Sequence, residues 1–267
     1  MSKTTAHLTT QTPAPWKAQF ESHISKMDSP EFVLATLHEA PPGSTIPYLP
    51  RARYCIYRGM WAELPENKHN SAPKNERMYG SDLPTFTTDV RMEKVWELFE
   101  TGPGKAEKRE QTLGSGGGGP VEAVFWIGEV KTQWRIKGSA WIVAPDVDSA
   151  EESSGVRSLK AQIGERMRIV KEGSQEDWSW ARSWKNPPPG QPAEGEPDRD
   201  HKLGQKVEDL DDPIARENFR VVIIKPDTVE SVDLTDPEKA RRHLYTFVTK
   251  DEDGEKRGEW KEDILWP

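Results

Sequence analysis

Two segments of the sequence constrain the fold most, because each joins strand-like runs to a concentration of polar side chains. Residues 85–94 (TFTTDVRMEK) read as a strand that runs into a turn and a helix start, with threonines, an arginine and a lysine close together. Residues 124–143 (VFWIGEVKTQWRIKGSAWIV) read as two strands with polar side chains on one face. Together they predict a β-rich protein with polar groups gathered beside a strand-to-helix junction.

The rest of the sequence adds short strands and separate helices to this pattern. Apolar residues recur at helical spacing in residues 15–28, 90–100 and 156–172. Strands are expected at residues 32–37, 52–64, 83–89, 218–226 and 228–235, with a closing hairpin around residues 251–258. Roughly seven or eight short strands, with helices that do not alternate strictly with them, favour a barrel with peripheral helices over a doubly wound parallel sheet. The expected class is mainly β with helices (α+β).

Three polar stretches are predicted to be insertions in a single domain that spans residues 1–267. They lie near residues 65–82, 101–120 and 186–206, and the last contains the run NPPPGQPAEGEP, which cannot form a packed element. The glycine run at 114–119 resembles a phosphate-binding loop only superficially, because no Lys-Ser/Thr pair and no helix pattern follow it. It is therefore interpreted as part of a flexible linker.

Composition and charge narrow the class of protein. Hydrophobic residues make up 34% of the 267 residues, below the usual apolar share, but the 11 tryptophans add large apolar areas for a core. The net charge of −8 argues against nucleic acid as a partner, since that binding needs a clustered basic surface. The longest clean apolar run, residues 221–224, is far too short to span a membrane.

Cysteine content and the N-terminal sequence favour a cytoplasmic location. A lone cysteine, Cys55, forms no intrachain disulfide, and its apolar surroundings predict a buried small hydrophobe in a reducing compartment. Residues 1–16 lack the apolar stretch of a secretory signal and carry no arginine. The six histidines show no metal-ligand spacing, and no Ser/His/Asp arrangement is visible, so no metal site is expected.

Five segments occur in the order found in one known family. They are PRARYCIYRG (50–59), TFTTDVRMEK (85–94), VKTQWRIKG (130–138), residues 217–247 and the closing GEWKEDILWP (258–267). The chain resembles the FMN-binding split barrels of the pyridoxamine 5′-phosphate oxidase-like family. Within that family it is similar to the flavin-binding oxidase-like proteins common in cyanobacteria and fungi. The resemblance implies a Greek-key split β-barrel with peripheral helices, FMN as cofactor, and a homodimer with the flavin in a cleft between subunits.

The resemblance also implies a set of cofactor-binding residues. Arg53 and Lys94 match contacts to the flavin phosphate and Gln133 matches the contact to the ring, while the backbone from Tyr54 to Ile56 lies along the flavin. A dianionic phosphate suits such cations and hydroxyl groups, and the ring needs donors near its edges. The full set is Arg53, Tyr54, Cys55, Ile56, Thr87, Thr88, Lys94, Gln133 and Arg242.

The chain departs from the oxidase pattern where the substrate would bind. Arg58 stands where the oxidases carry a substrate-binding lysine, which keeps the charge but changes the geometry. The Arg-x-His substrate motif falls on Glu238-Lys239-Ala240, and one of two phosphate-binding cations is replaced by Glu93. The resemblance therefore implies a flavin-dependent oxidoreductase with hydride transfer to flavin N5, acting on a small molecule that the sequence does not assign.

Other interpretations remain open on the sequence alone. The absence of Arg-x-His favours a non-catalytic flavin or tetrapyrrole carrier on the same barrel. An interaction module would use the acidic loops and the tryptophans at 178, 180 and 184 as its surface. Taken singly, Arg53 and Lys94 are ordinary surface charges and Gln133 an exposed strand residue. The sequence does not decide whether Arg241 or Arg242 faces a ligand.

Overall fold

A computed structural model describes residues 13–63, 79–103, 105–169, 212–236, 238–252 and 255–267. Most of these residues belong to one eight-stranded antiparallel sheet with the order β10-β9-β8-β4-β2-β1-β5-β6. The strands are β1 Glu31–Glu39, β2 Tyr48–Met60, β4 Pro84–Asp89, β5 Gly116–Ile127, β6 Thr132–Val143, β8 Phe219–Asp233, β9 Arg241–Glu252 and β10 Glu255–Leu265. Two short strands, β3 Tyr79–Ser81 and β7 Met167–Ile169, form a separate pair.

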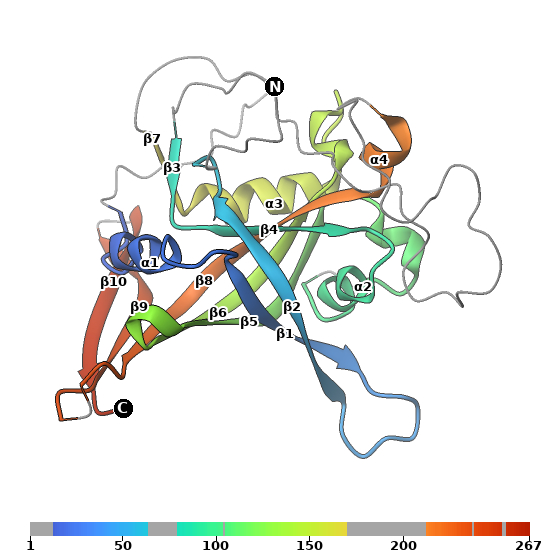
Figure 1. Ribbon diagram of the computed structural model, residues 1–267. Coiled ribbons are helices and arrows are strands. Elements are labelled where there is room, and N and C mark those ends of the chain that lie inside the picture. Colours follow the sequence, from blue (N-terminus) through green and yellow to red (C-terminus); the bar gives the residue numbers. More distant parts are fainter. Residues whose placement is uncertain (1–12, 64–78, 104, 170–211, 237, 253–254) are drawn as a thin grey trace.

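The sheet closes into a barrel through β8, which also pairs with β6. β6 follows β8 along most of its length, from Thr132 opposite Asp233 to Val143 opposite Val221. On its other edge, β8 pairs first with β4 and then, from Thr228 onward, with β9. The barrel therefore opens where β8 leaves β4, and the β9–β10 hairpin extends from that opening (Figure 1).

The strand order confirms the predicted Greek key. β4, β2, β1 and β5 lie side by side in that order, so the fourth strand along this stretch returns beside the first. The long return from β4 to β5 contains α2, Glu93–Glu100, which packs on β5 and β1. The predicted class, mainly β with peripheral helices, is also confirmed, and the predicted hairpins β5–β6 and β9–β10 are present.

The other helices cover the barrel from outside (Figure 1). α1, Lys17–Ile24, buries Phe20 and Ile24, and α3, Ser154–Gly164, buries Leu159 and Ile163. The Ser153 side chain accepts a hydrogen bond from the Val156 amide and so caps the start of α3. The remaining elements are α4, Pro213–Asn218, and the single-turn helices η1 Arg109–Thr112, η2 Gly128–Val130 and η3 Pro145–Asp148. Among the described residues, no helix is long and apolar enough to cross a membrane.

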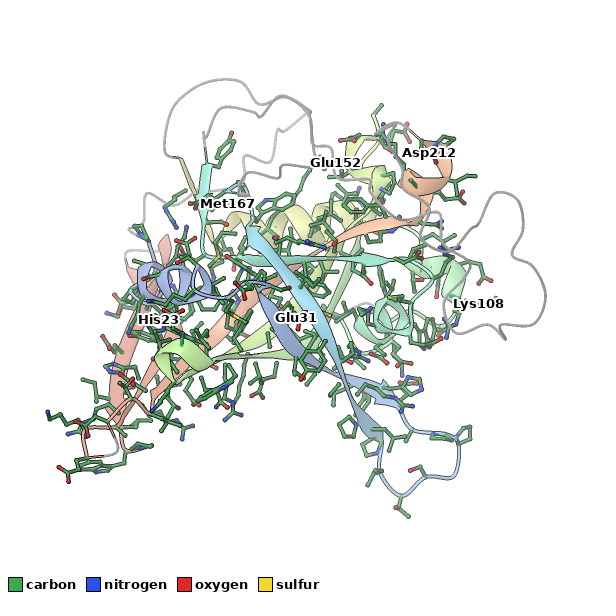
Figure 2. All side chains as sticks on the ribbon, viewed as in Figure 1. His23, Glu31, Lys108, Glu152, Met167 and Asp212 are labelled. Atoms are coloured by element: carbon green, nitrogen blue, oxygen red, sulfur yellow. The ribbon has the colours of Figure 1, made fainter. Side chains whose placement is uncertain are left out.

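Aromatic side chains fill the barrel (Figure 2). The Phe125 ring stacks on Phe32 with 4.8 Å between centroids, and it meets Phe20 edge-on at 5.1 Å. Trp134 lies against Phe20 and donates its indole N–H to His23 Nδ1 at 3.1 Å. Each large side chain buried in this way contributes about 1.5–3 kcal/mol. The core thus fixes the strands that carry the polar groups described below.

The glycine run at the end of the predicted 101–120 insertion is not a linker, because it forms the start of β5. α2 approaches this strand so closely that a Cβ at Gly119 would lie 2.5 Å from Thr101 Oγ1 and 2.8 Å from the Leu98 carbonyl oxygen. At Gly118, with φ of +95°, a Cβ would lie 2.6 Å from the Trp141 ring. Glycine is needed here so that helix and strand can meet.

Three other boundaries differ from the sequence prediction. The two strands expected at 218–226 and 228–235 are one continuous strand, β8, and Pro226 lies inside it opposite Gly138. The helix expected over 156–172 ends at Gly164, and Met167–Ile169 is a strand instead. Within the predicted insertion 65–82, Tyr79–Ser81 is also a strand. The 186–206 insertion and the tryptophans at 178, 180 and 184 lie outside the described residues.

Candidate functional site

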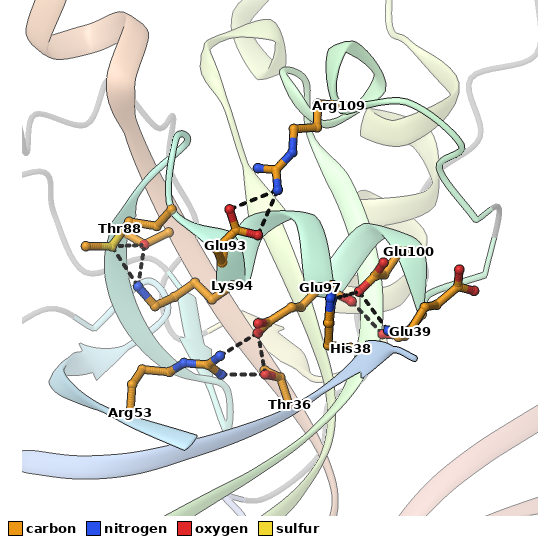
Figure 3. Close-up of polar contacts among 12 residues, drawn as sticks. Thr36, His38, Glu39, Arg53, Thr88, Glu93, Lys94, Glu97, Glu100 and Arg109 are labelled. Carbon is orange, nitrogen blue, oxygen red and sulfur yellow. Dashed lines mark hydrogen bonds and ion pairs between the residues drawn. The ribbon is translucent and has the colours of Figure 1, made fainter. Parts of the chain in front are cut away.

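The junction between β4 and α2 brings predicted site residues together beneath the helix (Figure 3). β4 ends at Asp89 and α2 begins at Glu93, so Thr88 and Lys94 face each other across the turn. Arg53 reaches the same place from β2, opposite Leu34 of β1. We call Arg53, Thr88 and Lys94, with Thr36 and Glu97 that bind Arg53, the cationic cluster.

Lys94 is held by the turn that precedes its own helix. Its Nζ lies 3.2 Å from Thr88 Oγ1 and 2.8 Å from Met92 Sδ. Burial lowers the pKa of Lys94, and the positive charge of nearby Arg53 lowers it further. A half-buried ammonium whose hydrogen-bond partners among the described residues are a hydroxyl and a thioether is poorly compensated, so it favours an added anion.

Arg53 is oriented by two buried acceptors on different elements. Its Nη2 donates to Glu97 Oε2 at 2.6 Å and its Nη1 donates to Thr36 Oγ1. Thr36 in turn donates to the same Glu97 oxygen at 2.5 Å. Glu97 is 2% exposed, whereas the Arg53 side chain is 22% exposed. The guanidinium is thus anchored from the inside, and its outer edge is partly open to solvent.

The segment from Tyr54 to Ile56 continues β2 past the cluster. Cys55 is buried as predicted, and burial raises the pKa of its thiol, so the thiol stays protonated at neutral pH. Tyr54 and Ile56 project to the opposite side, where Tyr54 is 76% exposed. Thr87 also points away from Thr88, since strand side chains alternate, and it pairs with Val221 on the side of α3.

Arg58 lies further along β2 with an incompletely paired guanidinium. Its Nε is buried without a hydrogen-bond partner, and burial lowers the pKa of the group. No salt bridge to Arg58 is present among the residues that the structure describes. Such a group favours a negatively charged ligand.

Gln133 and Arg242 lie in a second group, on the outer face of the sheet. Cross-strand partners share a face, and the register aligns Trp126, Gln133, Val232, Arg242 and Leu265 in one row across β5, β6, β8, β9 and β10. In the next row, Arg135 Nε donates to Glu122 at 2.6 Å, and Glu230 accepts from Arg242 Nη2 at 2.5 Å. Arg241 instead donates to its own neighbour, the Ala240 carbonyl, and is exposed.

The two groups are on opposite faces of the barrel wall within one chain. Arg53 shares its face with buried Leu34, whereas neighbouring Tyr54 pairs with Val33 and belongs to the outer face with Arg135. Within one chain, Arg242 therefore does not lie beside Arg53 and Lys94. The structure brings together Arg53, Thr88 and Lys94 on one side, and Gln133 with Arg242 on the other.

Thr36 and Glu97 were not among the residues predicted from the sequence. Glu97 is three residues after Lys94, so helical spacing places both on one face of α2. That spacing alone gave no sign that Arg53, from a strand far away in the sequence, would meet them. Among the described residues, no group of three or more His, Cys, Asp or Glu side chains could hold a metal ion.

Comparison with known proteins identifies a family for the first half of the chain. Residues 13–144 match the pyridoxamine 5′-phosphate oxidase, FMN-binding domain family. This part of the chain belongs to the pyridoxamine 5′-phosphate oxidase-like family. The matched segment contains the whole cationic cluster and Gln133, and it ends before β8 and β9. No curated protein matches the chain.

A solved structure agrees on the fold. A pyridoxamine 5′-phosphate oxidase-related, FMN-binding protein from Nostoc punctiforme PCC 73102 superposes with a TM-score of 0.52 at 16% identity, over 96% of this chain and 100% of that one. The predicted split barrel is thereby confirmed. PhzG from Burkholderia lata 383, in complex with tetrahydrophenazine-1-carboxylic acid, gives a TM-score of 0.40 at 14% identity over 94% and 90% of the two chains, which is too low to bear on the fold.

The cationic cluster fits the phosphate ester of a flavin nucleotide. It offers two cations and a hydroxyl group, and the Arg53 guanidinium has five N–H donors, of which the hydrogen bonds to Thr36 and Glu97 use only part. Charge-assisted hydrogen bonds from Arg and Lys are the usual means of holding a phosphate in proteins. The donor set therefore suits FMN, and the site's own Glu97 limits the charge that it can compensate.

Proposed function

We propose that this protein binds FMN and acts as a flavin-dependent oxidoreductase on a small anionic molecule. The observation that supports this most is the cationic cluster, where Arg53 and Lys94 stand at a strand-to-helix junction with a hydroxyl between the strand end and the helix. In the proposal, Arg53, Lys94 and Thr88 hold the phosphate. The β2 backbone from Tyr54 to Ile56 lies along the rest of the nucleotide.

The proposal includes a homodimer, because one chain does not bring all the predicted residues together. The outer face around Gln133 and Arg242 carries exposed aromatic side chains, with Trp126 52% exposed and Tyr54 76% exposed. Exposed aromatics beside a charged network are typical of an interface. A second copy of the chain on this face would bring Gln133 and Arg242 toward the ring of a flavin whose phosphate is held in the cationic cluster.

The protein's own residues would bind and orient the reactants. FMN, when bound, supplies a ring that accepts a hydride from the substrate. Arg58 carries a partly desolvated charge without a salt bridge in the described residues, so it is our candidate for contact with an anionic substrate group. Residues 238–240, in the turn before β9, are Glu-Lys-Ala in place of the Arg-x-His motif, so pyridoxal phosphate is not proposed as substrate.

The direct test is a cofactor scan. We expect the purified protein to show flavin absorbance, or to quench the fluorescence of added FMN on binding, with riboflavin bound more weakly because it lacks the phosphate. A colourless protein that also fails to take up FMN would contradict the proposal.

The competing function is a non-catalytic flavin or tetrapyrrole carrier. The absence of the Arg-x-His motif at residues 238–240 is the observation that favours it. Anaerobic mixing of the flavin-loaded protein with a panel of small anionic reductants separates the two. Bleaching by one of them supports the oxidoreductase, and no bleaching across the panel supports the carrier.

A further inference from the structure

A buried acid lies inside the site proposed for the phosphate. Glu97 is 2% exposed, and its Oε2 accepts hydrogen bonds from both Arg53 and Thr36. One carboxyl oxygen can accept from both donors at once, because it has two lone pairs. Glu97 also interacts electrostatically with Lys94, which is one turn earlier on α2. Any anion that reaches Arg53 and Lys94 therefore meets a negative charge that is already in place.

The other charged groups around Glu97 have partners of their own. Glu100, the next acid on this face of α2, lies 2.7 Å from the His38 ring of β1. Asp89 at the end of β4 is paired with Arg91 at 2.6 Å. Cys55 of β2 is a neutral thiol, because burial raises its pKa. Within the cluster itself, the two cations and the carboxylate of Glu97 thus leave one net positive charge for a ligand.

The charge of the ligand decides how well it matches this cluster. A phosphate monoester carries nearly two negative charges at pH 7, with a second pKa of about 6. A dianion would leave one negative charge uncompensated in a partly buried site, which is costly. An ester with a single charge would be balanced.

We propose that Glu97 sets the charge specificity of the site, so that a singly charged ester is preferred and FMN binds with uptake of one proton by its phosphate. This inference rests on the proposed FMN site. Glu97 then has two connected effects. Its carboxylate orients Arg53, and its negative charge lowers the ligand charge that the site can neutralise. A group that only stabilised the fold would not distinguish ligands by their charge.

The first experiment uses the unmodified protein with two ligands. FMN is compared with riboflavin 5′-sulfate, which has the same ring and chain but one permanent negative charge. Dissociation constants are measured by flavin fluorescence at pH 5.5 and 7.5, at constant ionic strength. We expect FMN to bind roughly 25-fold more weakly at pH 7.5 than at pH 5.5, as follows from a second phosphate pKa of about 6. The sulfate ester should change little, and any titration of Lys94 would affect both ligands alike.

The second experiment changes Glu97 alone. Glu97→Gln keeps an acceptor for Thr36 but removes the charge, so FMN should bind at least about tenfold more tightly at pH 7.5 relative to the sulfate ester. The matched control is Glu152→Gln, the same change at an exposed acid just before α3, where Glu152 pairs with Lys160. The control should leave the ratio of the two dissociation constants unchanged. Circular dichroism tests whether both variants are folded. If Glu97→Gln does not fold, the first experiment alone tests the proposal.

The outcomes separate this inference from the function on which it rests. If the unmodified protein binds neither ligand at either pH, the FMN proposal itself is wrong. If FMN binds and its affinity depends on pH no more than that of the sulfate ester, the role of Glu97 is overturned and the FMN site stands. A Glu97→Gln variant that binds both esters more weakly, with the ratio of their dissociation constants unchanged, would also overturn the inference. Glu97 would then only position Arg53.

Discussion

Gln133 and Arg242 stand on either side of Val232, one strand away in each direction, on the same face of the sheet. Neighbouring strands are about 4.8 Å apart, so the two polar side chains are separated by roughly 10 Å across β8. Both were predicted from the sequence as flavin contacts, and the register places them together although 109 positions separate their numbers. This row of side chains, which begins at Trp126, is the part of the sheet that we expect a second copy of the chain to cover.

We expect Trp126→Asp to weaken dimerisation and flavin binding together. The exposed indole would be replaced by a charge within the proposed interface, where desolvation is costly. Light scattering after size-exclusion chromatography should show a monomer at concentrations where the unmodified protein is dimeric. Leu113→Asp, an exposed apolar position outside the outer face, is the control and should change neither property. A monomeric unmodified protein that binds FMN fully would contradict the shared site.

Lys94→Met should weaken FMN binding by about 10- to 30-fold, since a charge-assisted hydrogen bond contributes about 1.5–2 kcal/mol. The affinity for riboflavin should change much less, because riboflavin has no phosphate. Lys160→Met, which removes an exposed lysine of α3 paired with Glu152, provides the control. Equal losses for FMN and riboflavin would show that Lys94 does not act on the phosphate.

The same variant carries a prediction about pH and stability. Burial lowers the pKa of Lys94 below its ordinary value of 10.5, so the folded state binds this proton less tightly than the unfolded chain. The charged lysine therefore destabilises the fold at neutral pH, and the penalty disappears as pH rises from the lowered pKa to 10.5. Denaturant unfolding at several pH values should show any stability gained by Lys94→Met to be largest at neutral pH and smallest near pH 10.5. A gain that grows with pH would have the wrong sign.

Arg53→Met should destabilise the protein by about 2–3 kcal/mol, because it leaves the buried carboxylate of Glu97 without its cation. Adding Glu97→Gln should restore part of this loss, since the remaining side chain is neutral. Urea unfolding of the two single variants and the double variant measures the coupling. Strictly additive effects would mean that the ion pair contributes nothing to the fold.

Gly138→Ala should destabilise the barrel by at least about 3 kcal/mol or prevent folding. An added Cβ would lie 2.0 Å from the Lys225 carbonyl oxygen, at the point where the register between β6 and β8 shifts. Gly128→Ala is a matched control on the β5–β6 connection, where the nearest atom would be 3.8 Å away. Thermal unfolding should separate the two variants clearly, and equal midpoints would contradict the packing described here.

Most strands could be predicted because β-branched, aromatic and alternating apolar residues mark them, as in β1 and β2. The glycines of β5 were misread because nothing in the local sequence shows that α2 lies against them, and a glycine run without partners is flexible. Pro226 suggested a break in β8, but it falls opposite Gly138, where the ladder is irregular and its missing N–H is tolerated. Helix 156–172 was overextended since Met167 fits the helical spacing as well as it fits a strand.

The candidate site was predictable in its parts and not in its arrangement. Arg53, Thr88 and Lys94 were found because they match a known order of motifs, and the structure brings them together. The sequence does not show which face of the sheet each of these residues points to, because this depends on how the strand pairs with its neighbours. Thr87 and Thr88 are adjacent in the sequence but point to opposite sides. Glu97 was missed because an acid on an amphipathic helix is ordinarily a solvated charge.

β8 belongs to both the closed barrel and the hairpin that leaves it, and this continuity has a consequence for evolution and engineering. A residue inserted between Thr228 and Val232 would shift the register between β8 and β9 by one position. The β9 side chains paired with this stretch would then point to the opposite face of the sheet, and Arg242 would turn from the outer surface toward the core. The length of this one strand is therefore constrained, because its register with β6 and β9 sets the face on which Gln133 and Arg242 lie.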